Sequence, residues 1–251
     1  MILPIGDDNR DRRIFPFINY LLVALNIFVF FYWQQWGNNV PFTFAFATVP
    51  AEILTGTDII TETKVLTDPY TGQQFDMPGL QRTPVNVYLT LFTSMFMHGG
   101  LAHLFGNMMF LWIFGDNIED ALGHINYLIF YLLCGVLASL SHVFSTLVLG
   151  QNTLIPSLGA SGAISAVLGG YILLFPKRSV HVWTFFFIST IPAFIVVGLW
   201  FVFQVLNGLG TLGGEEAGGV AYAAHIGGFI FGLLLVKKFV SKRTVVRRKR
   251  Y

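Results

Sequence analysis

The sequence has few charged residues and only one cysteine. Asp, Glu, Lys and Arg make up 11% of its 251 residues, whereas a soluble domain has about 25%. So few charges cannot cover a water-exposed surface, so an ordinary soluble globular enzyme is excluded. The single cysteine, Cys134, rules out an internal disulfide, and we expect it to be a small buried apolar side chain.

Apolar residues are abundant instead. They account for 54% of the chain, with 26 Phe, 9 Tyr and 5 Trp, and the mean hydropathy is +0.65. This composition excludes a disordered chain, because disordered segments are poor in aromatic residues. It favours a polytopic membrane protein, in which lipid replaces water around most of the surface.

Six apolar segments qualify as membrane-spanning helices, which need about 20 residues each, although the fourth of them is short. They are residues 15–36, 101–121, 126–147, 161–175, 183–206 and 220–240. The sequence therefore predicts an all-α membrane protein: a six-transmembrane-helix bundle over 15–240, with a long first outer loop at about 37–100. Residues 1–14 and the basic tail 241–251 flank it, and no second domain or internal repeat is evident.

Basic residues indicate the orientation. They precede the first segment, lie between the fourth and fifth, and follow the sixth, and six crossings place all three groups on one side. By the positive-inside rule that side is the cytoplasm, so both termini are expected there. Eight of the fifteen basic residues follow Leu235, which favours contact of this tail with anionic membrane lipid over nucleic acid.

Polar residues inside a bilayer are costly and often functional, and the first such group opens the fourth segment. There Ser161 lies between Gly159 and Gly162. One interpretation is a helix-capping serine beside glycines that serve packing. The other is a nucleophile at a helix N-terminus, where free N–H groups stabilise negative charge. The order Gly-Ala-Ser-Gly-Ala does not match the Gly-x-Ser-x-Gly motif of soluble hydrolases.

The second group is in the sixth segment, where His225 is followed by Gly227 and Gly228. Small residues at four-residue spacing allow two helices to pack closely. The sixth segment has Gly228 and Gly232, and the fourth has Gly162, Ala166 and Gly170. We expect these two helices to pack together and to bring His225 near Ser161, as a general base requires.

The third group is His98, His103 and Asn107, at the start of the second segment. His103 and Asn107 share one helix face, and both can donate a hydrogen bond to an anionic oxygen. Zinc binding is the competing interpretation, but no carboxylate or thiolate lies nearby, so we expect no metal. Asp116, Glu119 and Asp120 lie about 20 Å or more farther along this helix, which favours a Ser–His dyad without an acid.

Together these three groups resemble the rhomboid family of intramembrane serine proteases, in its prokaryotic six-helix form. The matching motifs are His98…His103…Asn107, Gly159-Ala160-Ser161-Gly162 and Ala224-His225-Ile226-Gly227-Gly228. The resemblance implies a catalytic dyad of Ser161 and His225. It implies an oxyanion hole formed by Asn107, His103 and the backbone N–H of Ser161, and no cofactor. It assigns structural roles to His98, Glu119, Gly159, Gly162, Gly227 and Gly228.

The function that this resemblance implies is cleavage of transmembrane segments of other membrane proteins near the outer leaflet. The expected partners are such substrates and membrane lipids, the expected location is a prokaryotic cytoplasmic membrane, and the oligomeric state is left open. Ser165 departs from the family pattern, because many members carry an aromatic residue there that packs on the catalytic imidazole. Another side chain must therefore hold His225.

Two alternatives keep the membrane fold but change the function. One is a catalytically silent rhomboid-like protein that binds membrane clients, against which the intact Ser161 and His225 argue. The other is a small transporter, whose polar groups would form a path across the bilayer midplane. The sequence shows no pairing of Asp116, Glu119 or Asp120 with Lys or Arg that would indicate such a path.

Overall fold

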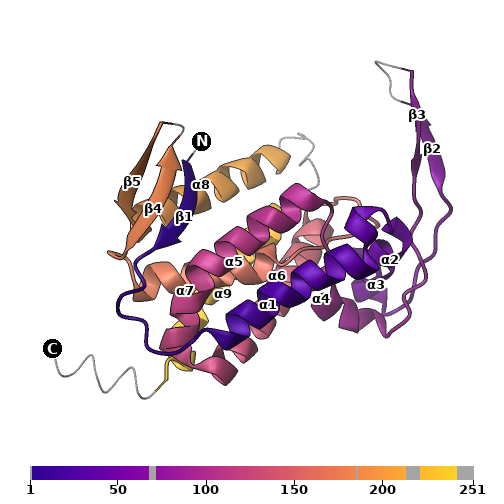
Figure 1. Cartoon of the computed structure of the whole chain (residues 1–251). Helices are drawn as coiled ribbons and strands as arrows, with labels where there is room; N and C mark the ends of the chain where they lie inside the picture. Colours follow the sequence, from indigo (N-terminus) through magenta and orange to yellow (C-terminus); the bar gives the residue numbers. More distant parts are fainter. Residues whose placement is uncertain (1, 68–71, 185, 213–220, 242–251) are drawn as a thin grey trace.

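The computed structural model describes residues 2–67, 72–184, 186–212 and 221–241, and its architecture is mostly helical (Figure 1). The long helices are α1 (Phe17–Phe28), α5 (Leu101–Leu122), α6 (His124–Val148), α7 (Ser161–Leu174), α8 (Ala193–Leu212) and α9 (Tyr222–Phe239). A π-helical turn, Val29–Trp33, extends α1. The predicted basic tail, from residue 242 onward, lies outside the described residues.

Three helices in the described part of the chain are long and apolar enough to cross a membrane. They are His124–Val148, Ala193–Gly210 and Tyr222–Phe239. Phe17–Trp33 and Ser161–Leu174 are shorter apolar helices, and α5 carries three acidic residues near its C-terminal end. The protein is therefore a mostly helical membrane protein, and a bundle with six crossings stays a prediction.

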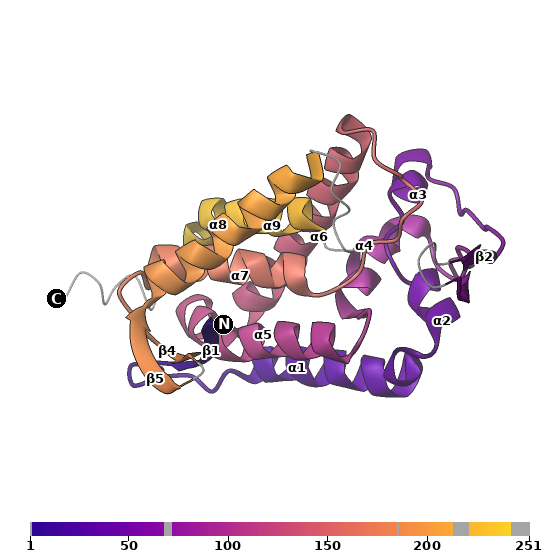
Figure 2. The same ribbon diagram turned by 90° about the horizontal axis from the view of Figure 1, so that it is seen from above.

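Helix α7 is the centre of the bundle (Figure 2), where it contacts α5, α6, α8 and α9. Its packing against α9 depends on glycine. A Cβ added to Gly228 would lie 2.2 Å from the carbonyl oxygen of Gly162, and one added to Gly232 would lie 2.1 Å from that of Ala166. The predicted close packing of these two helices through small residues is therefore confirmed. Cys134 is buried and unpaired, as expected.

The structure also contains strands, so the all-α prediction was wrong in this respect. A three-stranded antiparallel sheet has the order β1 (Ile2–Asp7), β4 (Ser179–Thr184), β5 (Phe187–Pro192). The fifth helix therefore begins at Ala193 and not near 183. Residues 179–184 alternate in burial, with Val180 and Val182 fully buried, and this period of two suits a strand. The partner strand β1 is supplied from the distant N-terminus.

The long loop before α5 is itself folded. It contains α2 (Val40–Ala45), α3 (Pro50–Thr55), α4 (Thr90–Thr93) and the hairpin of β2 (Lys64–Thr67) with β3 (Gln74–Met77). The hairpin projects from the opposite end of the molecule to the β1–β4–β5 sheet (Figure 1). Thr48 and Ser157 exchange backbone hydrogen bonds of 2.9 and 2.8 Å, so the loop fixes the segment that leads into α7.

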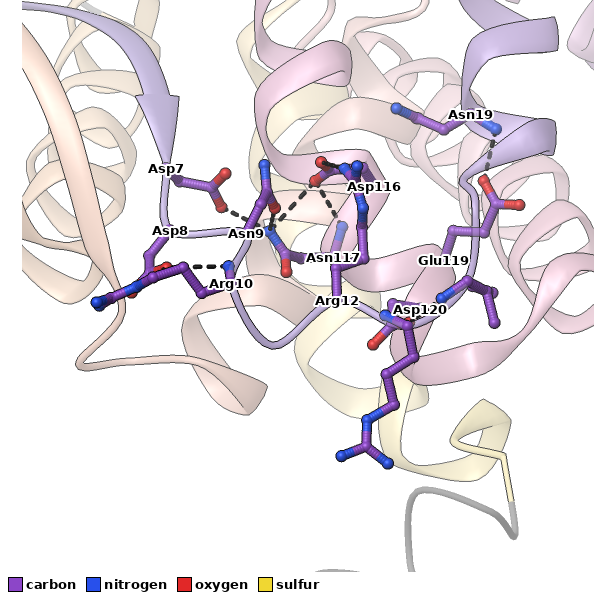
Figure 3. A network of polar contacts seen from close by, with 12 residues as sticks. Asp7, Asp8, Asn9, Arg10, Arg12, Asn19, Asp116, Asn117, Glu119 and Asp120 are labelled. Atoms are coloured by element: carbon purple, nitrogen blue, oxygen red, sulfur yellow. Dashed lines mark hydrogen bonds and ion pairs between the residues drawn. The ribbon is translucent and has the colours of Figure 1, made fainter.

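A polar network joins the N-terminal segment to the C-terminal end of α5 (Figure 3). Arg12 forms an ion pair of 2.5 Å with Asp116, and the Asp120 carboxylate accepts a hydrogen bond from the Arg13 backbone N–H at 2.8 Å. The expectation that the acids of this helix lack a basic partner was therefore wrong for Asp116. The partner comes from residues that precede the first helix, and spacing along α5 cannot reveal it.

Asp7, at the end of β1, lies in the same network. Its carboxylate accepts hydrogen bonds from the Tyr171 hydroxyl and from the Asn117 amide, the latter at 2.8 Å. The pKa of Asp7 is raised to about 7, mainly by burial and also by the neighbouring Asp116 carboxylate. The hydrogen bonds from Tyr171 and Asn117 and the charge of Arg178 act in the opposite direction. Asp7 therefore ties the sheet to both α5 and α7.

Glu119 is fully buried and forms the N-terminal cap of α1. Its two carboxylate oxygens accept the backbone N–H groups of Ile18 at 3.0 Å and Asn19 at 2.7 Å. His124 Nδ1 lies 2.5 Å from the same carboxylate. The residue before α1, Pro16, provides no side-chain cap, so Glu119 supplies from another helix what the local sequence lacks.

Candidate active site

Ser161 is the first residue of α7, and Ala160 occupies the cap position without a side-chain cap bond. The chain reaches it through Gly159, whose φ of +120° is a conformation that favours glycine. The Gly159 N–H donates to the Ser94 carbonyl at 2.8 Å. The Ser161 hydroxyl is therefore not used as a helix cap, which removes the structural interpretation of this serine.

His225 lies in the first turn of α9, and its Nε2 is 2.7 Å from Ser161 Oγ. The structure thus brings together the two residues that the sequence paired, across 64 positions of the chain. The glycine contacts between α7 and α9 make this possible, because they let the two backbones approach. Hydroxyl and imidazole at this distance have the geometry of a nucleophile with its general base.

The second ring nitrogen of His225 has a partner that sequence reasoning missed. Nδ1 lies 2.7 Å from Oε1 of Gln204 on α8, and Gln204 is only 6% exposed. The rings of Trp200 and Tyr222 flank the imidazole, with centroids 6.1 and 6.3 Å away. A glutamine within an apolar helix is itself a signal, because a buried amide needs a partner.

Ser165, which stands where the family often has an aromatic residue, does not contact the imidazole through a hydrogen bond. Its hydroxyl donates to the Ser161 carbonyl at 2.6 Å, one turn back along α7. The role expected of an aromatic at this position is therefore taken by side chains from α8 and α9.

His103 and Asn107 lie one turn apart on α5, and the His103 ring approaches Ser161 at Gly159. The Gly99 N–H donates to His103 Nδ1 at 3.4 Å, so a neutral His103 carries its proton on Nε2. A Cβ added to Gly159 would lie 2.9 Å from that Nε2 and 3.6 Å from Ser161 Oγ. The His103 donor and the serine oxygen therefore border the same small space, which glycine leaves open.

Asn107 presents a second hydrogen-bond donor. The residue is 8% exposed, and its Nδ2 is buried without a hydrogen-bond partner among the described residues. A buried N–H without a partner costs about 1–3 kcal/mol. Such a group, one turn from His103 on the same helix, is suited to an oxyanion that forms only during a reaction.

The remaining predicted residues support this arrangement from outside. His98 is fully buried, its backbone is bound on both sides by the Gln34 side chain at 3.0 and 2.8 Å, and its ring packs edge-on against His103. A Cβ at Gly162 would lie 2.8 Å from Ala138 Cβ, and one at Gly227 would lie 2.3 Å from Ser141 Oγ. Both glycines therefore allow α6 to approach α7 and α9.

A cavity of about 20 Å³ adjoins Ser161, which is room for about one water molecule. Most of its walls are small or polar residues, and they come from the short helix Ser94–Phe96, the segment before α7, and α6, α7 and α9, with Met95 and Leu158 as larger apolar members. They include Ser94, Gly135, Ser139, Ser157, Gly162 and Ala224. In the part of the chain that the structure describes, no group of three or more His, Cys, Asp or Glu side chains is placed to hold a metal. Glu215 and Glu216 lie outside the described residues.

Comparison with known families agrees with the motifs. A model of the Rhomboid domain matches residues 86–242, which include α5 to α9 and every residue of the site described above. The chain belongs to the rhomboid family.

Curated rhomboid relatives are similar over the same region. The chain is 31% identical to "Rhomboid protein 1, mitochondrial" of Saccharomyces cerevisiae, over 68% of this chain and 47% of that protein. It is 28% identical to the human "Presenilin-associated rhomboid-like protein, mitochondrial", over 64% and 43%. It is 34% identical to "RHOMBOID-like protein 4" of Arabidopsis thaliana, over 58% and 32%. The chain thus spans half or less of the length of these rhomboid relatives.

These names bear on the predicted location. The yeast and human relatives are mitochondrial by name, which does not fit the expectation of a prokaryotic cytoplasmic membrane. The apolar helices and the rhomboid domain support a membrane location.

Proposed function

We propose that this rhomboid protein is an intramembrane serine endopeptidase, with Ser161 as nucleophile and His225 as general base. The observation that carries the proposal is the 2.7 Å separation of His225 Nε2 and Ser161 Oγ. A hydroxyl is a weak nucleophile unless a base accepts its proton. The surrounding glycines and the donors on α5 are what a serine hydrolase needs around that pair.

In the proposed reaction, Ser161 Oγ attacks the carbonyl carbon of a peptide bond while its proton passes to His225 Nε2. The carbonyl oxygen becomes an oxyanion, which accepts hydrogen bonds from His103 Nε2–H, Asn107 Nδ2–H and the backbone N–H of Ser161. When the C–N bond breaks, the proton on His225 passes to the leaving amine. Water, deprotonated by His225, then hydrolyses the acyl-enzyme and regenerates the serine.

We propose a transmembrane segment as the substrate, cleaved toward the outer leaflet. Asp116 lies thirteen residues beyond His103 on α5, about 20 Å away at helical rise, and it marks the end that the basic residues assign to the cytoplasm. The dyad is therefore placed toward the opposite end of a bundle in which α1 and α5–α9 make the six crossings. The narrow cavity beside Ser161 favours a small side chain next to the cleaved bond.

The proposal is tested with purified protein in liposomes and a labelled single-span substrate. Wild type and Ser141→Ala should release product, since the Ser141 hydroxyl only donates to its own helix at Leu137. Ser161→Ala and His225→Ala should release none, and a fluorophosphonate should label wild type but not Ser161→Ala. Equal product from all four proteins would exclude the proposed dyad. Stable substrate capture by wild type, with neither product nor labelling, would instead favour the client-binding alternative.

A further inference from the structure

Gln204 extends the Ser161–His225 pair to a third helix. Its Oε1 is 2.7 Å from His225 Nδ1, and Nε2 of the same ring is 2.7 Å from Ser161 Oγ. One line of hydrogen bonds therefore runs from α8 through α9 to α7. Gln204 is nearly fully buried, so its amide is not merely directed at the ring from solvent.

The chemistry of this contact is directional. The amide oxygen can only accept, so the proton of the neutral imidazole is held on Nδ1 and the lone pair of Nε2 faces the serine hydroxyl. That tautomer is the one a general base requires, and the other one presents an N–H to the serine. The same oxygen stabilises the imidazolium that forms when Nε2 takes up the proton.

No other described side chain is placed to do this. The charged or titratable groups of neighbouring helices that interact with His225 are histidines, His103 on α5 and His142 on α6, and neither forms a hydrogen bond with Nδ1, which Gln204 occupies. Tyr222 and Trp200 flank the ring through aromatic contacts and not through hydrogen bonds. The acids of α5 are bound at the far end by the N-terminal segment.

We infer that Gln204 is a positioning residue, which fixes the tautomer and the orientation of His225 for its role as a base. This inference rests on the proposed protease function. It also answers the absence of an aromatic residue at position 165: here the imidazole is held by an amide from α8. An amide does this without placing a second charge in a bilayer, where a carboxylate would be costly.

The test compares Gln204→Leu, Gln204→Glu and the control Asn207→Leu in the full chain, using the substrate assay described above. Asn207 lies on the same helix, but its amide donates to the Phe203 carbonyl of its own helix at 2.7 Å and does not reach His225. Loss of the acceptor in Gln204→Leu should lower kcat about 10- to 100-fold, as expected for one hydrogen bond to a charged group. KM should change less than twofold, and Asn207→Leu should match wild type.

Gln204→Glu provides a readout that a purely structural role would not move. Its carboxylate keeps the hydrogen bond and favours the charged imidazolium, so activity should be recovered at high pH. The acid limb of the pH–rate profile should move at least one pH unit upward relative to wild type. If thermal unfolding shows that Gln204→Leu does not fold, the shift of the acid limb in Gln204→Glu alone tests whether Gln204 positions His225.

The possible failures are distinguishable. Wild-type kcat in Gln204→Leu, or an unmoved acid limb in Gln204→Glu, would overturn the positioning role while cleavage by wild type leaves the proposed function intact. Absence of cleavage and of fluorophosphonate labelling in wild type and Asn207→Leu would overturn the function itself, and the inference with it.

Discussion

One added methyl group between α7 and α9 should separate the Ser161–His225 pair. A Cβ placed on Gly228 would lie 2.2 Å from the carbonyl oxygen of Gly162, whereas ordinary van der Waals contact begins near 3.4 Å. The obstacle is backbone and not a side chain that could rotate away. In Gly228→Ala the two helices must therefore move apart by about 1 Å.

The size of the effect follows from the site geometry. His225 and Ser161 are the fourth residue of α9 and the first residue of α7. A displacement of about 1 Å lengthens their 2.7 Å contact beyond hydrogen-bond range. We expect kcat to fall about 100-fold and the free energy of unfolding to fall by about 1–3 kcal/mol, so the protein should remain folded at room temperature.

The assay measures kcat in liposomes and the thermal midpoint in detergent. The matched control is Gly198→Ala on α8, where an added Cβ meets no atom within 4 Å. Its kcat should equal that of wild type, and its thermal midpoint should be equal or slightly higher because Ala favours a helix more than Gly does. Wild-type kcat in Gly228→Ala, with Gly198→Ala behaving as expected, would refute the claim that close backbone packing sets the separation of the pair.

Substitutions at three further residues test other parts of the structure. Asp7→Asn should raise the thermal midpoint relative to wild type at pH 8 more than at pH 5. Burial raises the pKa of Asp7 from its ordinary 3.8 to about 7 in the folded state, so between these pH values the folded state holds a proton that the unfolded state has lost. The free energy of unfolding of wild type therefore falls by up to about 4 kcal/mol as pH rises through this window. A pH-independent difference would contradict this. Glu119→Ala should lower the thermal midpoint strongly, because it leaves the buried N–H groups of Ile18 and Asn19 without an acceptor, at a cost of about 1–3 kcal/mol each. Glu119→Gln keeps one acceptor, so its thermal midpoint should lie between those of Glu119→Ala and wild type. A thermal midpoint of Glu119→Ala equal to that of wild type would exclude the capping role. Asn107→Ala should reduce kcat about 100- to 1,000-fold with little change in KM, and a loss confined to KM would argue against an oxyanion donor.

The helices and the pairing of Ser161 with His225 could be predicted because their signals are local. Apolar runs of about 20 residues indicate spans, and small residues every fourth position indicate a close helix contact. The observed α7 and α9 differ from the predicted segments by at most two residues at either end, and α7 begins at the predicted residue.

The strands and Gln204 could not be found in the same way. Residues 183–192 are as apolar as a span, and they form a hairpin because β1, more than 170 residues earlier, covers the edge of β4. Gln204 stands out as an amide in an apolar helix, but its partner His225 is known only once α8 is packed against α9. Arg12 likewise finds Asp116 across 104 positions. These features depend on contacts between distant segments, which no periodicity in one segment contains.

The capping of α1 by Glu119 has a consequence for biosynthesis. Glu119 lies 101 positions after Ile18, whose N–H it accepts, so α1 leaves the ribosome well before its acceptor exists. Until α5 arrives, the first N–H groups of α1 need water or lipid headgroups as partners. The start of α1 must therefore wait at the aqueous boundary, and its final burial follows the insertion of a later helix.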